Sequence, residues 1–138
     1  MGALGRTIVA HLVLLSLTAM LGLSADLCSP DVIVGANYPR EARGARIEGI
    51  VRISLLITAD GRVIGTTAAS GHPVLRKFVE SELREWRFPS ANKCSAVEMQ
   101  WIFKLNGYCE HAPNCKERFL FKSPNIVELT SEMPGLQP

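Results

Sequence analysis

The segment from Tyr38 to Pro89 constrains the fold of this chain most, because strand, turn and helix signals follow one another with little linking sequence. Residues Ile50–Ile57 alternate between a fully apolar face and a mixed face, which predicts a strand in an antiparallel sheet covered on one side. Asp60-Gly61 predicts a hairpin turn, and Arg62–Ala69 forms the expected return strand. The segment therefore predicts a compact hairpin at the start of a sheet.

A helix and a further strand follow this hairpin. Pro73 suits a first helical position and Pro89 stops a helix, so we expect a helix over Pro73–Arg87. Residues Val97–Leu105 alternate without interruption and predict another strand. The order strand, strand, helix, strand indicates an α+β fold with an antiparallel sheet and a helix on one face. The expected apolar stripe of the helix consists of Leu75, Phe78, Val79, Leu83 and Trp86.

The C-terminal part of the chain extends this pattern. Arg118–Lys122 and Ile126–Thr130 read as two short strands around Ser123-Pro124-Asn125, which predicts a C-terminal β-hairpin. Asn106-Gly107 is expected to form a turn after the third strand. The last residues, Met133–Pro138, are expected to be a loose tail.

The N-terminus has the order of a secretory leader. Arg6 precedes the apolar run Ile8–Leu23, and the small residues Ser24 and Ala25 follow it. We expect a signal peptide over residues 1–25, with a short uncleaved anchor as the alternative, and contact with a membrane only in that second case. No later hydrophobic segment is long enough to span a bilayer.

The cysteines and the net charge narrow the class of protein. All four cysteines follow the leader, and an even number in a small exported domain indicates disulfides. Three pairings are possible; we favour Cys109–Cys115, which closes a short loop, together with Cys28–Cys94, which ties the N-terminal arm to the body. The net charge is +2 and no basic stripe stands out, so nucleic-acid binding has no electrostatic support.

Two groups of residues could suggest catalysis or metal binding. His72 could act as a general base, but its place directly before Pro73 favours a helix cap. Cys109, His111 and Cys115 could join Cys94 around a metal, but their spacing is not that of a standard site, and thiols of an exported chain pair with each other. We therefore expect no catalytic residue, no metal and no cofactor. Trp86, Phe88 and Trp101 are expected in the core.

Several short motifs occur together in a fixed order. They are Tyr38-Pro39, Glu48-Gly49, Asp60-Gly61-Arg62-Val63, Ser70-Gly71-His72-Pro73 and Trp86-Arg87-Phe88-Pro89, followed by the alternating strand. In this combination Tyr38–Leu105 resembles the TonB C-terminal domain family. The resemblance implies a three-stranded antiparallel sheet with a helix packed on one face. It also implies a non-catalytic binding module, periplasmic or tethered to the inner membrane, that contacts outer-membrane transporters in energy-coupled transport.

The resemblance also implies a place for the partner. Family members add a short transporter segment as a strand beside the third strand, and the unpaired backbone groups of an edge strand make this possible. Two alternatives stay open: the C-terminal hairpin covers this edge, or the edges of two copies pair in a homodimer with a structural role. The expected partner-binding edge consists of Val97, Glu98, Met99, Gln100, Trp101, Ile102, Phe103, Lys104 and Leu105.

These signals divide the chain into consecutive parts. The signal peptide, 1–25, precedes an extended arm, 26–37, and the TonB C-terminal-like domain, 38–105. A disulfide loop and hairpin extension, 106–132, and the tail, 133–138, complete the chain. The arm has no Pro-rich run and reaches roughly 45 Å when fully extended. An uncleaved leader would therefore hold the domain close to the inner membrane.

Overall fold

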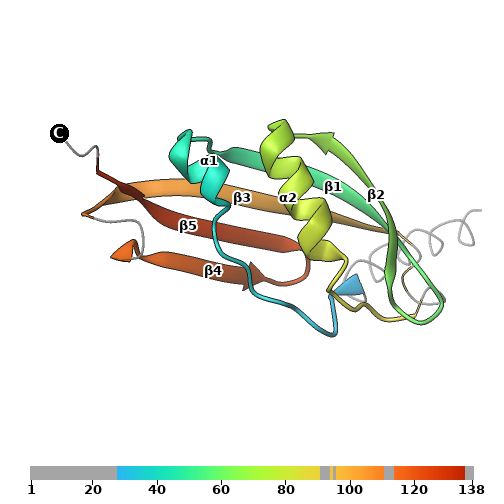
Figure 1. The fold of residues 1–138 in the computed structure, drawn as a ribbon. Coiled ribbons are helices and arrows are strands. Elements are labelled where there is room, and N and C mark those ends of the chain that lie inside the picture. The colour runs from blue at the N-terminus through green and yellow to red at the C-terminus, as the bar shows by residue number, and fades with distance from the viewer. Residues whose placement is uncertain (1–27, 91–93, 95, 111–113, 136–138) are drawn as a thin grey trace, which may run out of the picture.

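The computed structural model describes residues 28–90, 94, 96–110 and 114–135. These residues form one sheet with two helices on one of its faces (Figure 1). In chain order the elements are α1 (Arg40–Gly44), β1 (Gly49–Ile57), β2 (Val63–Ser70), α2 (Pro73–Leu83), β3 (Ala96–Cys109), β4 (Glu117–Lys122) and β5 (Ile126–Pro134).

The sheet has five strands in the order β2-β1-β3-β5-β4. β1 pairs antiparallel with β2 and with β3, β5 runs parallel to β3, and β4 pairs antiparallel with β5. The α+β class is therefore confirmed, but the expected three-stranded antiparallel sheet with a separate hairpin is wrong in its detail. The hairpin joins the same sheet, which makes the sheet mixed, because the apolar face of β5 continues the core beside β3.

Each element follows from its local sequence. In α2, Pro73 opens the helix and the apolar residues Leu75, Val79 and Leu83 turn inward at helical spacing and are buried. The β1–β2 turn depends on Gly61, whose φ of +81° is a conformation that other residues rarely adopt. Thr58 and Asp60 contact each other through their side chains within this turn.

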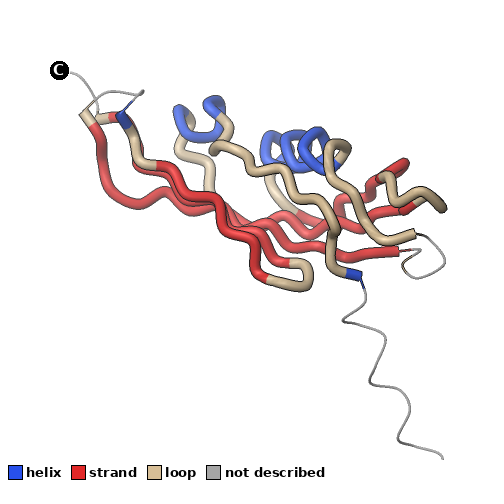
Figure 2. Tube along the Cα trace, turned by 90° about the horizontal axis from the view of Figure 1, so that it is seen from below, coloured by secondary structure: helices blue, strands red, loops and turns tan. Residues whose placement is uncertain are grey.

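The core lies between the helices and the sheet. Alternate residues of β1 and β3 point toward the helices, and Trp86 and Trp101 are fully buried there, with ring centroids 5.5 Å apart. Phe88 is buried beside Trp86, which confirms the expected core role of these aromatic residues. Figure 2 shows the helices on one side of the sheet and no described element on the other.

Three predicted boundaries are wrong. The helix α2 ends at Leu83, short of Arg87, because the backbone leaves the α-helical hydrogen-bonding pattern there. The N–H of Trp86 donates to the carbonyl oxygen of Leu83, three residues back, and the N–H of Arg87 donates to Val32 of the arm. The expected turn at Asn106-Gly107 is an irregularity within β3, which continues to Cys109. The expected tail begins inside β5, where Met133 pairs with Tyr108.

Both expected disulfides are present. Cys28 is bonded to Cys94 across a separation of 66 residues, and Cys109 to Cys115 across 6. The first ties the start of the described chain to the segment before β3. The second joins the end of β3 to the approach to β4. The predicted leader, residues 1–25, and the first residues of the predicted arm lie outside the described residues.

Candidate functional site

The short motifs before β1 have structural roles. The hydroxyl group of buried Tyr38 donates a hydrogen bond to the carbonyl oxygen of Ile47 at 2.6 Å. Burial raises the pKa of Tyr38, and the nearby Glu48 carboxylate raises it further. The Oε1 atom of Glu48 accepts a hydrogen bond from the backbone N–H of Leu105 at 2.6 Å, and so holds the part of β3 that extends past the first residue of β1. These two side chains therefore serve the fold, since each bonds to the backbone of a neighbouring segment.

His72 and the cysteines also have structural roles. The Nδ1 atom of His72 accepts a hydrogen bond from the backbone N–H of Val74 at 3.2 Å, as an N-cap of α2. Cys94, Cys109 and Cys115 are bonded in disulfides and are not thiolate ligands for a metal. His111 lies outside the described residues. Within the described part of the chain, no group of three or more potential ligand side chains could hold a metal ion.

The expected binding edge on β3 is already paired. From Gln100 onward β5 lies beside β3, with Trp101 opposite Val127 and Phe103 opposite Leu129. Val127 and Leu129 are fully buried, so this pairing is part of the core. The expectation that Val97–Leu105 forms an open edge is therefore corrected, because β3 lies inside the sheet. The alternative, a C-terminal hairpin that covers the edge, describes the structure.

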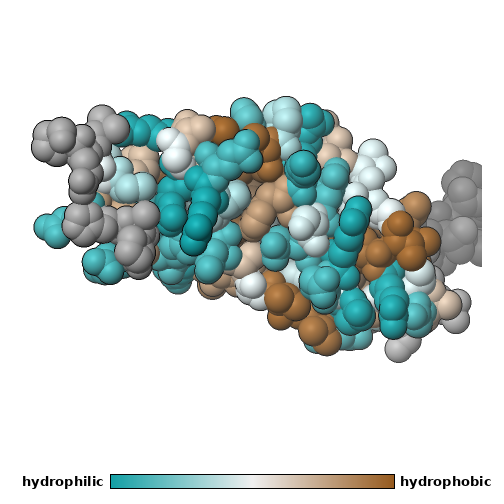
Figure 3. All heavy atoms as spheres, in the orientation of Figure 1, coloured by the Kyte–Doolittle hydropathy of each residue, from teal (hydrophilic) through white to brown (hydrophobic). Residues whose placement is uncertain are grey.

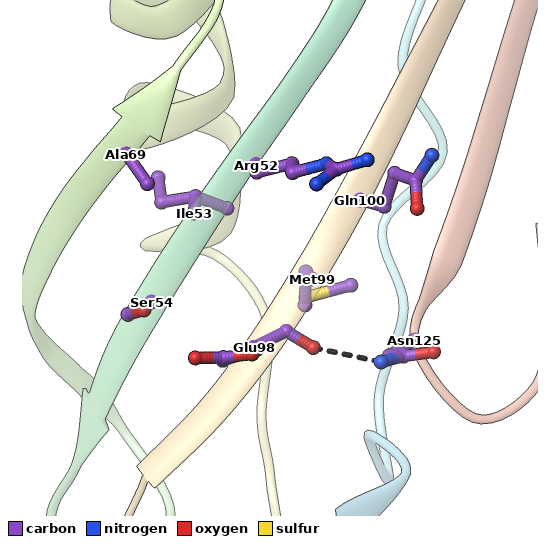
Figure 4. A pocket seen from close by; sticks show the side chains of 8 residues that line it. All are labelled: Arg52, Ile53, Ser54, Ala69, Glu98, Met99, Gln100 and Asn125. Atoms are coloured by element: carbon purple, nitrogen blue, oxygen red, sulfur yellow. Dashed lines mark hydrogen bonds between the residues drawn. The ribbon is translucent and has the colours of Figure 1, made fainter.

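The start of β3 is the only part of the expected edge that β5 does not reach. The Nδ2 atom of Asn125 donates a hydrogen bond to the carbonyl oxygen of Glu98 at 2.9 Å (Figure 4). The backbone oxygen of Asn125 also accepts one from the N–H of Gln100. A depression of about 400 Å³ lies at this step, lined by Arg52, Glu98 and Asn125 among others. Residues Val97–Met99 thus lie outside the stretch of β3 that pairs with β5, but the side chain of Asn125 already bonds to one of their carbonyl groups.

The sheet instead ends in two other edges, β2 and β4. The pairing of β2 with β1 shifts register twice, between Arg52 and Ile53 and between Leu56 and Ile57. The pairing of β4 with β5 runs over six residues without a shift. A regular edge suits the addition of a strand better than an irregular one. Because its pairing has no register shift, β4 is the more regular of the two edges in the described sheet and the better suited to strand addition.

Charged side chains lie around β4 and β5. Glu128 is flanked by Lys122 at 3.0 Å and Lys104 at 3.6 Å, and the hydrogen bond from Lys122 lowers the pKa of Glu128. At the other end of β4, Arg43 of α1 forms an ion pair with Glu117 at 2.7 Å. Glu117 and Glu128 are thus engaged with basic side chains, whereas the Oε2 atom of Glu132 accepts a hydrogen bond from the backbone N–H of Lys116 at 2.9 Å. Arg118 is exposed and takes part in none of the ion pairs found among the described residues.

The sequence analysis did not identify these contacts. The side chains of Glu48 and Asn125 each make one hydrogen bond to the backbone of β3, and the side chain of Arg43 pairs with Glu117, far along the chain. Only the Glu48-Gly49 motif gave a signal, as a pair before a strand. Hydrophobic periodicity does not indicate which strand a polar side chain will bond to. The contacts of Asn125 and Arg43 therefore could not be predicted from sequence patterns.

Comparison with known proteins agrees with this geometry. The family model for the C-terminal part of the Gram-negative bacterial TonB protein matches residues 34–105, which run from the arm into β3. The chain belongs to the TonB C-terminal family. The match covers the structural motifs at Tyr38, Glu48, Gly61, His72 and Trp86, and it ends before β4 and β5.

Individual relatives cover the same region. The protein TonB of Klebsiella aerogenes is 36% identical over 73 residues, 51% of this chain and 30% of that protein. The protein TonB of Escherichia coli K12 is 33% identical over 76 residues, 54% of this chain and 32% of that protein. The chain thus spans about a third of the length of these relatives. Among the residues that the structure describes, no helix has the length and apolar character needed to cross a bilayer.

Proposed function

We propose that this chain is a non-catalytic protein-binding module of the cell envelope that takes an extended segment of a partner into its sheet. The single observation that supports this most is the match of residues 34–105 to the TonB C-terminal family. The role of that family makes a periplasm-facing segment of an outer-membrane transporter the first partner to test, and energy-coupled transport the process. The leader-like order of the N-terminal sequence supports a periplasmic domain, free or tethered to the inner membrane.

The sheet supports a binding mode based on the backbone. An added strand gains hydrogen bonds from the unpaired N–H and C=O groups of an edge, and alternate side chains of both strands set the specificity. His72 caps a helix and the four cysteines form disulfides, so the side chains that could suggest catalysis serve the fold. Binding beside Val97–Leu105 remains part of this proposal, on the condition that the partner displaces β5.

Displacement of β5 has a cost that can be estimated. It would expose Val127 and Leu129, and each buried aliphatic side chain contributes roughly 1.5–3 kcal/mol. A segment that binds in place of β5 must therefore offset several kcal/mol before any net affinity appears. A segment that binds at a free edge carries no such cost.

The test is a titration of the oxidised, isotope-labelled full chain with peptides from the periplasm-facing N-termini of outer-membrane transporters. Backbone amide shifts are followed by NMR, and scrambled peptides of the same composition are the control. Saturable shifts in strand residues with the native peptides, and none with the scrambled ones, are the expected result. Absence of saturable shifts with every transporter peptide would overturn the proposal.

A further inference from the structure

From the geometry of β4 we infer that its outer edge is a strand-acceptor site for an extended segment of another protein in which acidic and apolar residues alternate. This inference rests on the proposed function and names the edge and the chemistry of the partner. β4 is the outermost strand on one side of the sheet and pairs only with β5 among the described residues. Figure 2, which views the molecule from this side, shows β4 in front with the N-terminal arm passing above it on the helix side.

The hydrogen-bonding pattern shows which residues of β4 face outward. The backbone N–H of Glu132 donates to the carbonyl oxygen of Lys116 at 3.0 Å, so Lys116 faces β5. Neighbouring residues of a strand direct their backbone groups to opposite sides, and every second residue therefore faces β5. By this alternation, Glu117, Phe119 and Phe121 direct their N–H and C=O groups away from the sheet. An incoming strand would find a row of three such residues.

One side of this edge is apolar. Phe119 and Phe121 are half-buried on the helix side, where their rings contact Trp86 at centroid distances of 6.4 and 6.1 Å. The N-terminal arm, residues 28–37, crosses above them and leaves Val32 49% and Val34 39% exposed. Figure 3 shows hydrophobic residues along the lower border of the molecule, where Figure 1 places this arm beside β4. Apolar side chains on one side of an added strand would bury this surface.

The other side of the edge is basic. Arg118 and Lys122 of β4 are exposed and alternate with the two phenylalanines, so they lie on the sheet face opposite the helices. Lys116 is exposed just before the strand. The only acidic residue of β4 is Glu117, and Arg43 already pairs with it. On this face Lys122 and Lys104 share the one carboxylate of Glu128. Arg118 forms no ion pair among the described residues, so acidic side chains of an added strand would meet an excess of positive charge.

The charge pattern also selects between occupants. Two copies of this chain paired through β4 would bring two basic edges together, and like charges across a strand pair are destabilising. A segment with alternating acidic and apolar residues complements both sides of the edge at once. The partner is therefore a different protein and not a second copy of this chain.

The experiment uses the oxidised full chain and an eight-residue synthetic peptide, four repeats of Glu-Val, with blocked ends. Binding is measured by amide hydrogen exchange and by NMR shifts. We expect slower exchange at Glu117, Phe119 and Phe121, and unchanged exchange at Arg118 and Leu120. A peptide with Lys in place of each Glu should bind roughly tenfold more weakly.

Matched variants separate the charge of the edge from the net charge of the protein. Arg118→Glu should weaken the Glu-Val peptide by roughly tenfold and strengthen the Lys-Val peptide, because it reverses the charge at the edge. Lys77→Glu makes the same change in net charge on the exposed surface of α2 and should leave both affinities unchanged. Glu117→Pro and Glu117→Ala both remove the ion pair with Arg43, but only the proline also removes one outward N–H, so Glu117→Pro should bind the Glu-Val peptide more weakly than Glu117→Ala.

Each other outcome overturns the inference. Shifts at Val97–Leu105 with loss of protection in β5 would place the partner beside β3, and would leave the proposed function intact. A solution mass twice that of the chain, with Phe119 and Phe121 protected without peptide, would assign the edge to self-pairing. No binding of the Glu-Val peptide, together with binding of a transporter segment elsewhere, would refute the β4 site alone. No binding of any segment would refute both proposals.

Discussion

The indole rings of Trp86 and Trp101 lie 5.5 Å apart in the core, but only one of their N–H groups has a hydrogen-bond partner among the described residues. Trp86 donates from Nε1 to the carbonyl oxygen of Val34 at 3.2 Å, whereas the Nε1 atom of Trp101 is buried without an acceptor. Trp86 therefore connects the core to the N-terminal arm as well as filling space. Trp101 contributes to the core through its ring contacts with Trp86, Phe103 and Phe119.

This difference predicts unequal effects of the same substitution. Trp86→Phe and Trp101→Phe remove similar volume, but only the first breaks a hydrogen bond and leaves the Val34 carbonyl without its partner. We expect Trp86→Phe to cost about 1 kcal/mol more in the free energy of unfolding than Trp101→Phe. Urea titration of both variants measures the difference, and equal costs would contradict it. Truncation to Trp86→Ala should cost about 3–5 kcal/mol in the same assay.

The two tryptophans also show how far sequence patterns determine the fold. Their burial follows from their positions on the apolar faces of a helix pattern and a strand pattern, and the structure confirms both. The β1–β2 hairpin, the N-cap role of His72 and both disulfides were predicted from local signals in the same way. Each of these features depends on residues close in sequence or on chemistry specific to one residue type.

The order of the strands could not be predicted in this way. Alternation tells which side chains of β5 are buried, but it does not tell whether β5 or β4 lies beside β3. In the structure the segment after Cys109 leaves a gap beside β3 and β4 forms one strand further out. β5 then fills this gap and pairs parallel with β3. For this reason the sequence left open whether the edge at Val97–Leu105 is free or covered, and the structure has the covered edge from Gln100 onward. The edge depends on contacts between Trp101 and Val127 that no local pattern reports.

The Gly61 turn gives a second test of the fold. Gly61 has a positive φ, and a Cβ atom there would lie 2.0 Å from the carbonyl oxygen of Phe88. Gly61→Ala should therefore cost at least about 3 kcal/mol, because it combines backbone strain with a clash against main chain. Gly44→Ala is the matched control, since nothing lies within 4 Å of its Cβ position at the end of α1. Thermal unfolding of both variants would show whether their midpoints differ as expected.

The two disulfides should differ in their contribution to stability. In the chain-entropy model a disulfide stabilises more when it closes a longer loop, and the separations here are 66 and 6 residues. The double variant Cys28→Ala/Cys94→Ala should therefore lose about 2 kcal/mol more than Cys109→Ala/Cys115→Ala. Guanidinium unfolding of the two oxidised proteins measures this difference. A greater loss for the shorter loop would show that the Cys109–Cys115 bond supports the β3–β4 connection beyond loop closure.

Stability at alkaline pH should depend on Tyr38. Burial and the nearby Glu48 carboxylate raise the pKa of Tyr38 above its ordinary value of about 10, so the folded chain keeps a proton that the unfolded chain loses. Its contribution to stability is therefore complete below pH ~10 and decreases above it, by up to about 1.4 kcal/mol per pH unit.

Tyr38→Phe separates this titration from the loss of a hydrogen bond. At pH 7 the variant should be less stable by about 1 kcal/mol, because the bond to the Ile47 carbonyl is lost. Between pH 10 and pH 12 its unfolding free energy should fall less steeply than that of the parent, because the variant lacks the Tyr38 hydroxyl group. The exposed Tyr108 is common to both chains and does not contribute to the difference. Urea titrations at a series of pH values measure both effects. Parallel pH profiles would mean that Tyr38 titrates in the folded state as it does in the unfolded state.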